Sequence, residues 1–298
     1  MTEVQQRCGL IALIGRPNVG KSTLLNHLVG QKLSITSRKP QTTRQRVLGI
    51  KTRDYAQLIY VDTPGYHLGE KKALNRAMNK TVGTVLLDVD IVLLVIDRLG
   101  FGPEDEDLLA MLQRQQVPVF LVINKVDQLP DKSALLPFID QLRRRWDFFR
   151  EVVPVSALKQ DNTAELEQTL VRYLPEQAWF YPEDQLTDRS ARFLAAEFVR
   201  EKITRQMGDE LPYAVAVEIE EFKIEGDTQH ISALILVEKE SQKKMLIGEG
   251  GSRLKLIGIE ARKEMERMFE SKVMLRLWVK VKGGWSDDER ALQSLGFD

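Results

Sequence analysis

The sequence predicts an α/β domain with a doubly wound, mostly parallel sheet, followed by a smaller α+β domain. Three observations support this prediction. Short apolar runs alternate with helical patterns through the first half of the 298-residue chain. These runs are rich in valine, isoleucine and leucine without polar alternation, which is typical of parallel strands buried on both faces. After residue 174 the alternation stops, at a proline followed by a polar stretch that contains several acidic residues.

The first domain is expected to span residues 1–178. Strand–helix alternation of this kind favours a parallel sheet with helices on both faces. Apolar runs predict strands at 10–14, 58–61, 91–96, 117–123 and 152–155, and a further strand at 47–52 that turns into 58–61 around Arg53 and Asp54. Helical patterns are found at 21–29, 104–114 and 133–146.

A linker at 179–190 is predicted to lead into a second domain at 191–298, which includes a C-terminal tail. An amphipathic helix opens this part of the chain, and the turn Glu225-Gly226-Asp227 is suited to a hairpin between two strands. The expected order is α-β-β-α-α-β, with elements at 190–207, 213–222, 229–237, 242–247, 252–269 and 273–281.

The composition is that of a soluble globular protein, with 43% hydrophobic and 29% charged residues. No apolar run approaches the roughly 18 residues that a membrane-spanning helix needs. The first residues lack the basic-then-apolar layout of a secretory signal. The single cysteine, Cys8, excludes an internal disulfide framework and favours a reducing, cytoplasmic setting.

The net charge of zero conceals an asymmetry along the chain. Residues 179–238 carry 6 Lys and Arg against 13 Asp and Glu, a net charge of −7. Residues 239–282 carry 12 against 6, a net charge of +6. A basic block that follows an acidic one indicates an anionic partner at one place on the protein.

Residues 15–22 read GRPNVGKS and match the pattern G-x-x-x-x-G-K-[ST], with an apolar run before them and a helical pattern after them. Gly15 and Gly20 let backbone N–H groups surround phosphates, to which the helix N-terminus adds its positive end. Lys21 can reach the β- and γ-phosphates as a point charge. The Ser22 hydroxyl suits Mg²⁺, which prefers hard oxygen ligands. The alternative, a glycine turn with an incidental lysine, does not explain the flanking strand and helix.

The segment Asp62-Thr63-Pro64-Gly65 ends another apolar run. An acidic residue at the C-terminal end of a strand lies at the same sheet edge as the phosphate loop, where it can hold the metal through water. The backbone N–H of Gly65 can approach the γ-phosphate. The pattern D-x-x-G is common in turns. Its position at the end of a strand is what supports a role in binding metal and phosphate.

The segment Asn124-Lys125-Val126-Asp127 follows the apolar run at 117–123 and is expected to select the base. Guanine presents an N1–H and a 2-amino group side by side, and the two oxygens of Asp127 match that pair of donors. Adenine would leave the carboxylate unpaired, and sites of this kind discriminate by roughly 10⁴ or more. Asn124 is expected to brace the loop and the Lys125 stem to lie over the base. Ser156 and Ala157 end the following strand, where the Ala157 N–H can meet the guanine O6.

Together these loops predict a guanine-nucleotide site at the carboxyl edge of the sheet. The residues expected to bind GTP are Gly15, Arg16, Pro17, Asn18, Val19, Gly20, Lys21, Ser22, Thr23, Asp62, Thr63, Pro64, Gly65, Tyr66, Asn124, Lys125, Val126, Asp127, Ser156 and Ala157.

This ordered set resembles the translation-factor-related class of regulatory GTPases. GRPNVGKS, QTTR at 41–44 and DTPG resemble the Era family in particular, whose GTPase domain is followed by a type II KH domain. The resemblance implies that 41–44 is the first switch, in which Thr43, with Thr42 as the alternative, closes over Mg²⁺ beside Ser22 and Asp62. The second switch would begin near Gly65.

The resemblance also bears on catalysis. Tyr66 follows D-x-x-G where Ras-type proteins carry glutamine, and a phenol does not orient the attacking water as an amide does. Slow intrinsic turnover is therefore expected. In related GTPases an asparagine at the position of Asn18 binds K⁺, and the alternative here is that Asn18 only braces the loop. The expected catalytic residues are Lys21, Thr43, Gly65 and Asn18.

In the second domain, the segment 247–251 matches the G-x-x-G loop of KH domains, which clamps single-stranded nucleotides. Apolar Ile247, Leu254 and Ile257 are expected to line a groove for bases. The alternative is a glycine-rich helix corner with a solvated charged face. The residues expected to bind RNA are Lys243, Lys244, Ile247, Gly248, Glu249, Gly250, Gly251, Arg253 and Lys255.

The family resemblance implies a GTPase switch that binds 16S ribosomal RNA near its 3′ end and assists assembly of the small (30S) subunit. Hydrolysis would release the RNA, with coupling from the second switch through the linker. The alternative is a GTPase that regulates a membrane- or protein-docked process such as cell division. Mg²⁺, K⁺ as a further option, GTP or GDP, and a monomer in the cytoplasm are expected, with peripheral association with the inner membrane implied by the resemblance.

Overall fold

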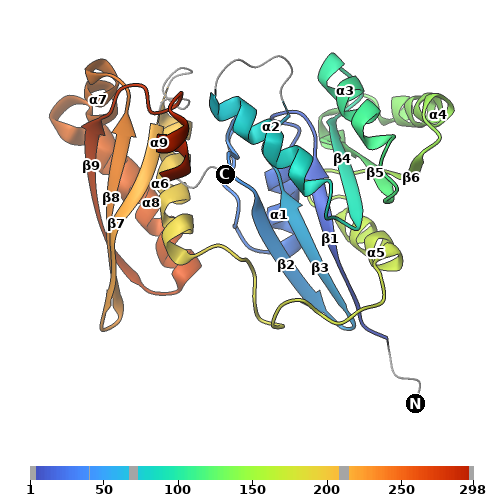
Figure 1. Cartoon of the computed structure of the whole chain (residues 1–298), viewed down its shortest axis with the longest axis horizontal. Helices are drawn as coiled ribbons and strands as arrows, with labels where there is room; N and C mark the ends of the chain where they lie inside the picture. The colour runs from blue at the N-terminus through green and yellow to red at the C-terminus, as the bar shows by residue number, and fades with distance from the viewer. Residues whose placement is uncertain (1–4, 40, 67–72, 208–214, 295–298) are drawn as a thin grey trace. The chain divides into compact units, whose positions relative to one another are not determined.

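The computed structural model describes residues 5–39, 41–66, 73–207 and 215–294, and the chain forms two compact units (Figure 1). The units are not continuous along the sequence. Residues up to 34, 43–66 and 78–188 form the first unit. Residues 35–42 and 73–77 join the part of the chain from residue 189 onward in the second unit. The predicted domain boundaries at 178 and 191 therefore stay predictions, and each unit is described by itself.

The first unit is built on a six-stranded sheet with the order β2-β3-β1-β4-β5-β6. Every neighbouring pair is parallel except β2 and β3, which form an antiparallel hairpin. The predicted doubly wound, mostly parallel fold is thereby confirmed. The strands are β1 (Arg7–Ile14), β2 (Val47–Arg53), β3 (Ala56–Asp62), β4 (Ile91–Asp97), β5 (Val119–Asn124) and β6 (Phe149–Pro154).

The central strands have almost no exposed surface, because helices cover both faces of the sheet. Every residue of β3 and β5 is buried, as is all of β4 except its last residue. Strands in this position need apolar side chains in both directions, which explains the absence of alternation in their sequences. The helices are α1 (Lys21–Val29), α2 (Ala73–Val85), α3 (Pro103–Leu112), α4 (Leu135–Arg145) and α5 (Thr163–Tyr173), with short 3₁₀ helices η1 (Val126–Gln128) and η2 (Lys132–Ala134).

Two helix N-termini in this unit have sequence causes that bear on the site. Helix α1 begins directly after Gly20, whose backbone is left-handed. Helix α3 begins with a proline at its first position, and the Asp105 carboxylate accepts a hydrogen bond of 2.9 Å from the Gly102 N–H. Both features favour initiation at these residues. They fix where the first turns of α1 and α3 lie relative to the strand ends.

The second unit contains a three-stranded sheet with the order β7-β8-β9, antiparallel between β7 and β8 and parallel between β8 and β9. Gly226, with φ +58°, turns the hairpin as predicted. The predicted order of elements is present, with α9 added in the tail; the predicted start of the first strand at 213 lies outside the described residues. The elements are α6 (Ala191–Gln206), β7 (Val215–Glu225), β8 (Thr228–Val237), α7 (Glu240–Ile247), η4 (Glu249–Gly251), α8 (Ser252–Phe269), β9 (Lys272–Val281) and α9 (Glu289–Ser294).

The core of the second unit lies where α6 and α8 contribute apolar side chains to the same cluster as the sheet. Phe198 of α6, Ile235 of β8 and Met265 of α8 are all at most 1% exposed and belong to this cluster. Within the described ranges, no helix combines the length and apolar character needed to cross a membrane.

Candidate functional site

The phosphate loop folds between β1 and α1 in a conformation that needs its glycines for packing. A Cβ on Gly15, which has φ +152°, would come within 2.3 Å of the Val95 carbonyl oxygen. A Cβ on Gly20, which has φ +103°, would come within 2.2 Å of Asn124 Nδ2. Both backbone conformations are rarely adopted by residues with a side chain. The glycines therefore let the loop lie against β4 and the end of β5, in addition to giving phosphates access to backbone amides.

Lys21 lies inside this loop and is only 6% exposed. Its ammonium donates hydrogen bonds of 2.9 Å to the carbonyl oxygens of Gly15 and Arg16. Burial lowers the pKa of Lys21 to about 8, although the charges of Asp62 and Asp105 oppose this change. A negatively charged phosphate at this point would stabilise the charged form of the lysine, which the surrounding protein disfavours. The loop is thus electrostatically suited to an anion.

The three predicted metal ligands lie next to one another. Ser22 Oγ is 2.7 Å from Thr43 Oγ1 and donates a 2.7 Å hydrogen bond to Asp62 Oδ2. The second oxygen of Asp62 is buried and has no hydrogen-bond partner in the described part of the chain, and burial raises the pKa of this carboxyl. Hard oxygens around an orphaned carboxylate fit Mg²⁺. The Thr42 hydroxyl instead donates to the Lys39 carbonyl at 2.6 Å, which favours Thr43 as the ligand.

Asn124 joins three loops at the predicted base pocket. Its Nδ2 donates to the Val19 carbonyl at 2.8 Å, and its Oδ1 accepts from the N–H groups of Lys125 and Ala157 at 2.8 and 2.9 Å. The side chain is 1% exposed, so these bonds form out of water. The Ala157 N–H, which the sequence assigns to the guanine O6, has Asn124 as its acceptor here. A bound guanine would have to share that donor.

The carboxylate expected to read the base lies in the short helix after β5. Asp127 Oδ1 accepts a 2.6 Å hydrogen bond from the Ser156 hydroxyl, which also accepts from the Lys159 N–H at 3.1 Å. Ser156 is fully buried. The role of Ser156 in this structure is therefore to orient Asp127 rather than to offer its own hydroxyl to a ligand.

Two acidic partners of the site were not predicted from the sequence. Asp97 ends β4 and pairs with the Lys125 ammonium at 2.8 Å. Burial raises the pKa of Asp97, but hydrogen bonds from Lys125 and Arg98 outweigh it and hold the pKa below its ordinary value. Asp105 of α3 pairs with Arg16 Nε at 2.7 Å. Asp97 follows an apolar run, so its position at the end of a strand could have indicated from the sequence that it lies at the site. No pattern in the sequence indicated Asp105.

Several residues predicted to bind GTP have side chains engaged within the protein. The Thr63 hydroxyl donates to the Leu13 carbonyl at 2.8 Å. Val19 and Val126 are 2% and 6% exposed in the core. Such residues can offer a nucleotide only their backbone groups. The second-switch residues 67–72 lie outside the described part of the chain.

In the second unit, the glycine loop joins α7 to α8. A Cβ on Gly248, with φ +73°, would come within 2.9 Å of the Arg253 Cβ, so this glycine is needed for packing. Gly250 and Gly251, with φ +56° and +78°, have no atom within 4 Å of such a Cβ. Arg253 donates a 2.6 Å hydrogen bond to the Met245 carbonyl, which ties the two helices together. The open side of the loop is therefore at Gly250 and Gly251, where a ligand has room to approach.

A groove of about 390 Å³ lies beside this loop, between α8 and β9. Of the three apolar residues predicted to line it, only Leu254 does so. Ile257 is fully buried in the core, because it lies on the face of α8 that also carries Ala261 and Met265 at successive turns. Ile247 is absent from the lining. The groove is lined by Gly251, Leu254, Lys255, Gly258, Ile259, Arg262, Leu275 and Leu277.

The residues just before Thr43 belong to the second unit. In the segment 35–42, Ile35 is 2% exposed and lies in the core that α6 helps to form. The Thr36 N–H donates a 2.9 Å hydrogen bond to Glu201, whose side chain is fully buried. Arg205 contacts the same two residues. Its guanidinium lies 2.9 Å from the Glu201 carboxylate and donates a 2.9 Å hydrogen bond to the Thr36 carbonyl. Helix α6 thereby holds the segment that leads into the predicted first switch at 41–44.

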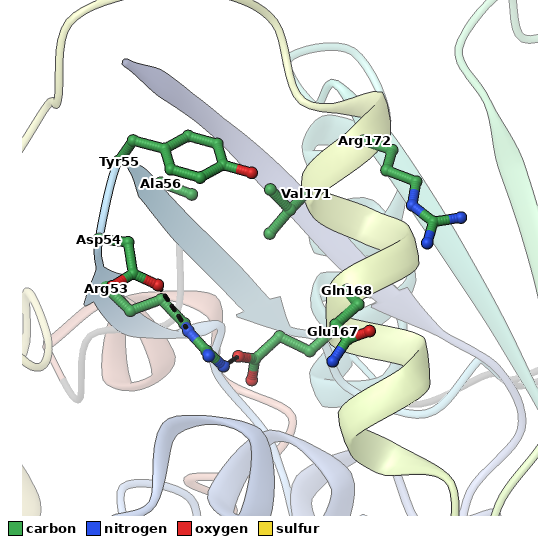
Figure 2. A pocket seen from close by; sticks show the side chains of 8 residues that line it. All are labelled: Arg53, Asp54, Tyr55, Ala56, Glu167, Gln168, Val171 and Arg172. Carbon is green, nitrogen blue, oxygen red and sulfur yellow. Dashed lines mark hydrogen bonds and ion pairs between the residues drawn. The ribbon is translucent and has the colours of Figure 1, made fainter. Parts of the chain in front are cut away.

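A separate pocket of about 290 Å³ lies between the β2–β3 turn and α5, as Figure 2 shows. Glu167 is the buried acid of this region and pairs with Arg53 at 2.5 Å and Lys51 at 2.6 Å. The pocket lies where β3 begins, whereas the nucleotide loops lie where β3 ends. It is therefore distinct from the predicted site. Its lining residues are Arg53, Asp54, Tyr55, Ala56, Glu167, Gln168, Val171 and Arg172.

Comparison with known proteins finds a matching family model in each part of the chain. A family model described as a 50S ribosome-binding GTPase matches residues 10–125, and a KH-domain model matches residues 210–286. The GTPase Era of Marinobacter nauticus is 62% identical over 292 residues, with 98% of this chain and 95% of that protein covered. The GTPase Era of Pseudomonas fluorescens is 60% identical over 291 residues, with 98% and 97% covered.

Solved structures of Era proteins are also similar to this chain over nearly its whole length. An Era structure in complex with MgGDPNP and nucleotides 1506–1542 of 16S ribosomal RNA superimposes with a TM-score of 0.93, at 40% identity. It covers 98% of this chain and 99% of that one. A variant of Aquifex aeolicus Era bound to GDP and AlF₄⁻ gives the same score, identity and coverage.

Substitution Asp127→Asn tests the base pocket. The amide presents a donor to the guanine N1–H and 2-amino group, so we expect GTP affinity to fall at least about a hundredfold. Xanthine carries an oxygen in place of the 2-amino group, so affinity for XTP should rise. Titration calorimetry with both nucleotides measures this exchange. Asp140→Asn, whose side chain is 60% exposed on α4, is the matched control. Unchanged preference for GTP in Asp127→Asn would contradict the assignment.

Proposed function

The chain belongs to the Era family of GTPases, and on that premise we propose that it is a switch that binds the 3′ end of 16S ribosomal RNA. In this proposal the GTP-bound form holds the RNA and assists assembly of the small ribosomal subunit, and hydrolysis of GTP releases the RNA. The observation that carries the proposal is the segment 35–42, because it packs in the second unit and runs directly into the predicted metal ligand Thr43.

The first unit supplies the nucleotide chemistry. Backbone amides of the phosphate loop and Lys21 hold the phosphates, Asp127 reads the base, and Gly65 and Thr43 detect the γ-phosphate. Ser22, Thr43 and Asp62 would hold Mg²⁺, which would supply positive charge to stabilise the negatively charged phosphates.

The second unit offers a surface suited to single-stranded RNA. The groove beside the glycine loop has apolar walls on which bases can lie, and basic side chains flank it. Lys244 and Lys255 are exposed, and Arg262 is part of the lining. Glu249 is also exposed and adds one opposing charge at the loop. A groove with apolar walls and a basic rim favours a polyanion with flat bases over a neutral ligand.

Coupling between nucleotide and RNA is supported by the contacts of α6. Arg200 donates a hydrogen bond to the Thr42 carbonyl, one peptide bond before Thr43. Together with the contacts of Glu201, this supports a route by which a displacement of Thr43 would reach α6. These contacts favour a route through the first switch over the route through the second switch and linker that the sequence suggests.

The turnover chemistry is expected to be slow. Tyr66 donates its phenol to Asp107, so the side chain after Gly65 is engaged with α3 and does not stand in for a water-orienting amide. We also propose that Asn18 binds K⁺ and that this ion supplies positive charge near the transferring phosphoryl group. Asn18 is exposed in the phosphate loop at φ +63°, with its carbonyl accepting a 2.6 Å hydrogen bond from Lys125.

The alternative from the sequence is a GTPase that is docked to a membrane or protein. It has no comparable support in the described residues, whereas RNA binding is supported by a groove and by the basic side chains that flank it. A ribosomal partner implies a cytoplasmic protein. Peripheral contact with the inner membrane and a monomeric state stay predictions.

Substitution Gly250→Asp tests the RNA groove. The new carboxylate would face phosphates, so we expect affinity for an oligonucleotide of the 16S 3′ end to fall at least about tenfold. Gly226→Asp is the matched control, since this turn glycine has φ +58° and nothing within 4 Å of a Cβ. Fluorescence anisotropy measures this affinity at several salt concentrations. If three cations contact phosphates, the logarithm of the association constant should fall against the logarithm of the salt concentration with a slope of roughly −2. Equal affinity in both variants would contradict the RNA assignment.

Substitution Glu201→Gln tests the coupling. The amide keeps the volume of the buried carboxylate but removes its charge, so the hold of α6 on Thr36 weakens. We expect the ratio of RNA affinities with GTP analogue and with GDP to shrink at least about threefold. The control is Glu220→Gln, an exposed residue of β7. A ratio unchanged from wild type would show that this contact does not transmit the nucleotide state.

Comparison of potassium and sodium buffers tests the ion. We expect GTP hydrolysis to be at least about tenfold faster in potassium, because positive charge stabilises the transition state. Asn18→Ala should abolish the difference. Asn162→Ala is the control, because Asn162 is also exposed and left-handed, with φ +58°. Equal wild-type rates in the two buffers would remove K⁺ from the mechanism.

A further inference from the structure

The residue after D-x-x-G is tied to helix α3 by its side chain. The Tyr66 phenol donates a hydrogen bond to Asp107 Oδ2, and its ring packs against the core of the first unit. Burial and the bond to Asp107 raise the pKa of Tyr66 to about 12, so the phenol stays protonated and keeps donating at neutral pH. Asp107 lies in the second turn of α3, which is a rigid point of attachment for the start of the second switch.

The backbone on either side of this attachment lies against the phosphate loop. The Tyr66 N–H donates to the Gly15 carbonyl at 3.3 Å. A Cβ on Gly65 would come within 2.7 Å of Pro17 Cγ and 2.9 Å of its backbone nitrogen. Gly65 therefore packs closely on the phosphate loop, and Tyr66 connects that loop to α3.

The same part of α3 also supports the phosphate loop itself. Asp105 is fully buried and pairs with Arg16 Nε at 2.7 Å. Arg16 also donates to the Gly100 carbonyl at 3.2 Å, just before the helix. Two acids, Asp105 and Asp107, thus hold the two chain segments that are predicted to contact phosphate. Because both lie on one helix, the distance between these segments is set by a single rigid element.

We propose that Tyr66 and Asp107 are positioning residues that hold Gly65 beside the phosphate loop and thereby set the preference for GTP over GDP. The proposal rests on the function proposed above, in which the Gly65 N–H meets the γ-phosphate. That phosphate is present only in GTP. When Gly65 is already held in place, less conformational entropy is lost on binding GTP, so GTP affinity is higher. GDP affinity is unchanged, because GDP has no γ-phosphate to contact Gly65.

The predicted metal ligands also lie together, since Ser22 contacts both Thr43 and Asp62. In the proposed site, Gly65 is therefore the remaining group whose position decides how well the γ-phosphate is met. A phenol held by a carboxylate does this without offering the nucleotide a group that orients water.

The test compares Tyr66→Phe, Asp107→Asn and the double variant. Affinities for GDP and for a non-hydrolysable GTP analogue are measured by titration calorimetry with Mg²⁺. We expect Tyr66→Phe to bind the analogue about tenfold more weakly, as for loss of a hydrogen bond to a charged acceptor. Asp107→Asn, whose amide oxygen still accepts the bond without a charge, should bind it about threefold more weakly, and GDP affinity should stay within about twofold of wild type in both. The double variant should be no weaker than Tyr66→Phe, because the two changes act on one interaction.

A second readout is single-turnover hydrolysis. The half-saturating GTP concentration should rise about tenfold in Tyr66→Phe, while the rate at saturation stays within about threefold, since binding and not chemistry is affected. Tyr55→Phe and Asp140→Asn, both exposed and away from the loop, are the matched controls. Urea unfolding of each variant verifies that the fold is retained.

Three results would overturn the proposal: equal loss of GDP and analogue affinity, which denotes a merely structural bond; no loss of either; or additive losses in the double variant. Failure of wild-type protein to bind GDP would instead reject the nucleotide site itself, so the two failures are distinguishable.

Discussion

The nucleotide site depends on the buried amide of Asn124. Parallel strands deliver their following loops to one edge of the sheet, but loops at a common edge are not yet a pocket. Asn124 connects them by donating to the phosphate loop at Val19 and accepting from its own loop and from Ala157. Gly20 permits this arrangement, since any side chain there would collide with the amide. One residue at 1% exposure therefore holds the phosphate loop and the two loops of the predicted base pocket in a fixed relation.

Around this centre, acids anchor the cationic side chains of the loops. Asp97 fixes Lys125, and Asp105 fixes Arg16. Asp105 is fully buried and Asp97 partly buried, and a charge withdrawn from water needs a partner. The result is that the arginine of the phosphate loop is directed to α3 and not to the ligand. Lys21 differs, because the hydrogen bonds that its ammonium makes among the described residues go to carbonyl oxygens, and burial disfavours its charged form. A bound phosphate would stabilise that charge.

In the second unit, helices α6 and α8 each contribute to the core and to one further feature. Successive turns of α8 place Ile257 and Ala261 in the core and Leu254 and Gly258 in the groove, so one helix both builds the unit and presents its binding surface. Helix α6 builds the same core and holds the segment that precedes Thr43.

The fold class, the Era family and the motifs at the ends of β1, β3 and β5 could be predicted from the sequence alone, because apolar periodicity and strand-end motifs are local properties of the chain. The order of elements in the second unit was predictable for the same reason. What the sequence could not supply were the partners: Arg16 with Asp105, Tyr66 with Asp107, Thr36 with Glu201. The error at Ile257 has the same origin, since the face of α8 that meets the core depends on how the helix packs. Opposite charges are numerous along a chain, and only tertiary packing decides which of them come within reach of each other.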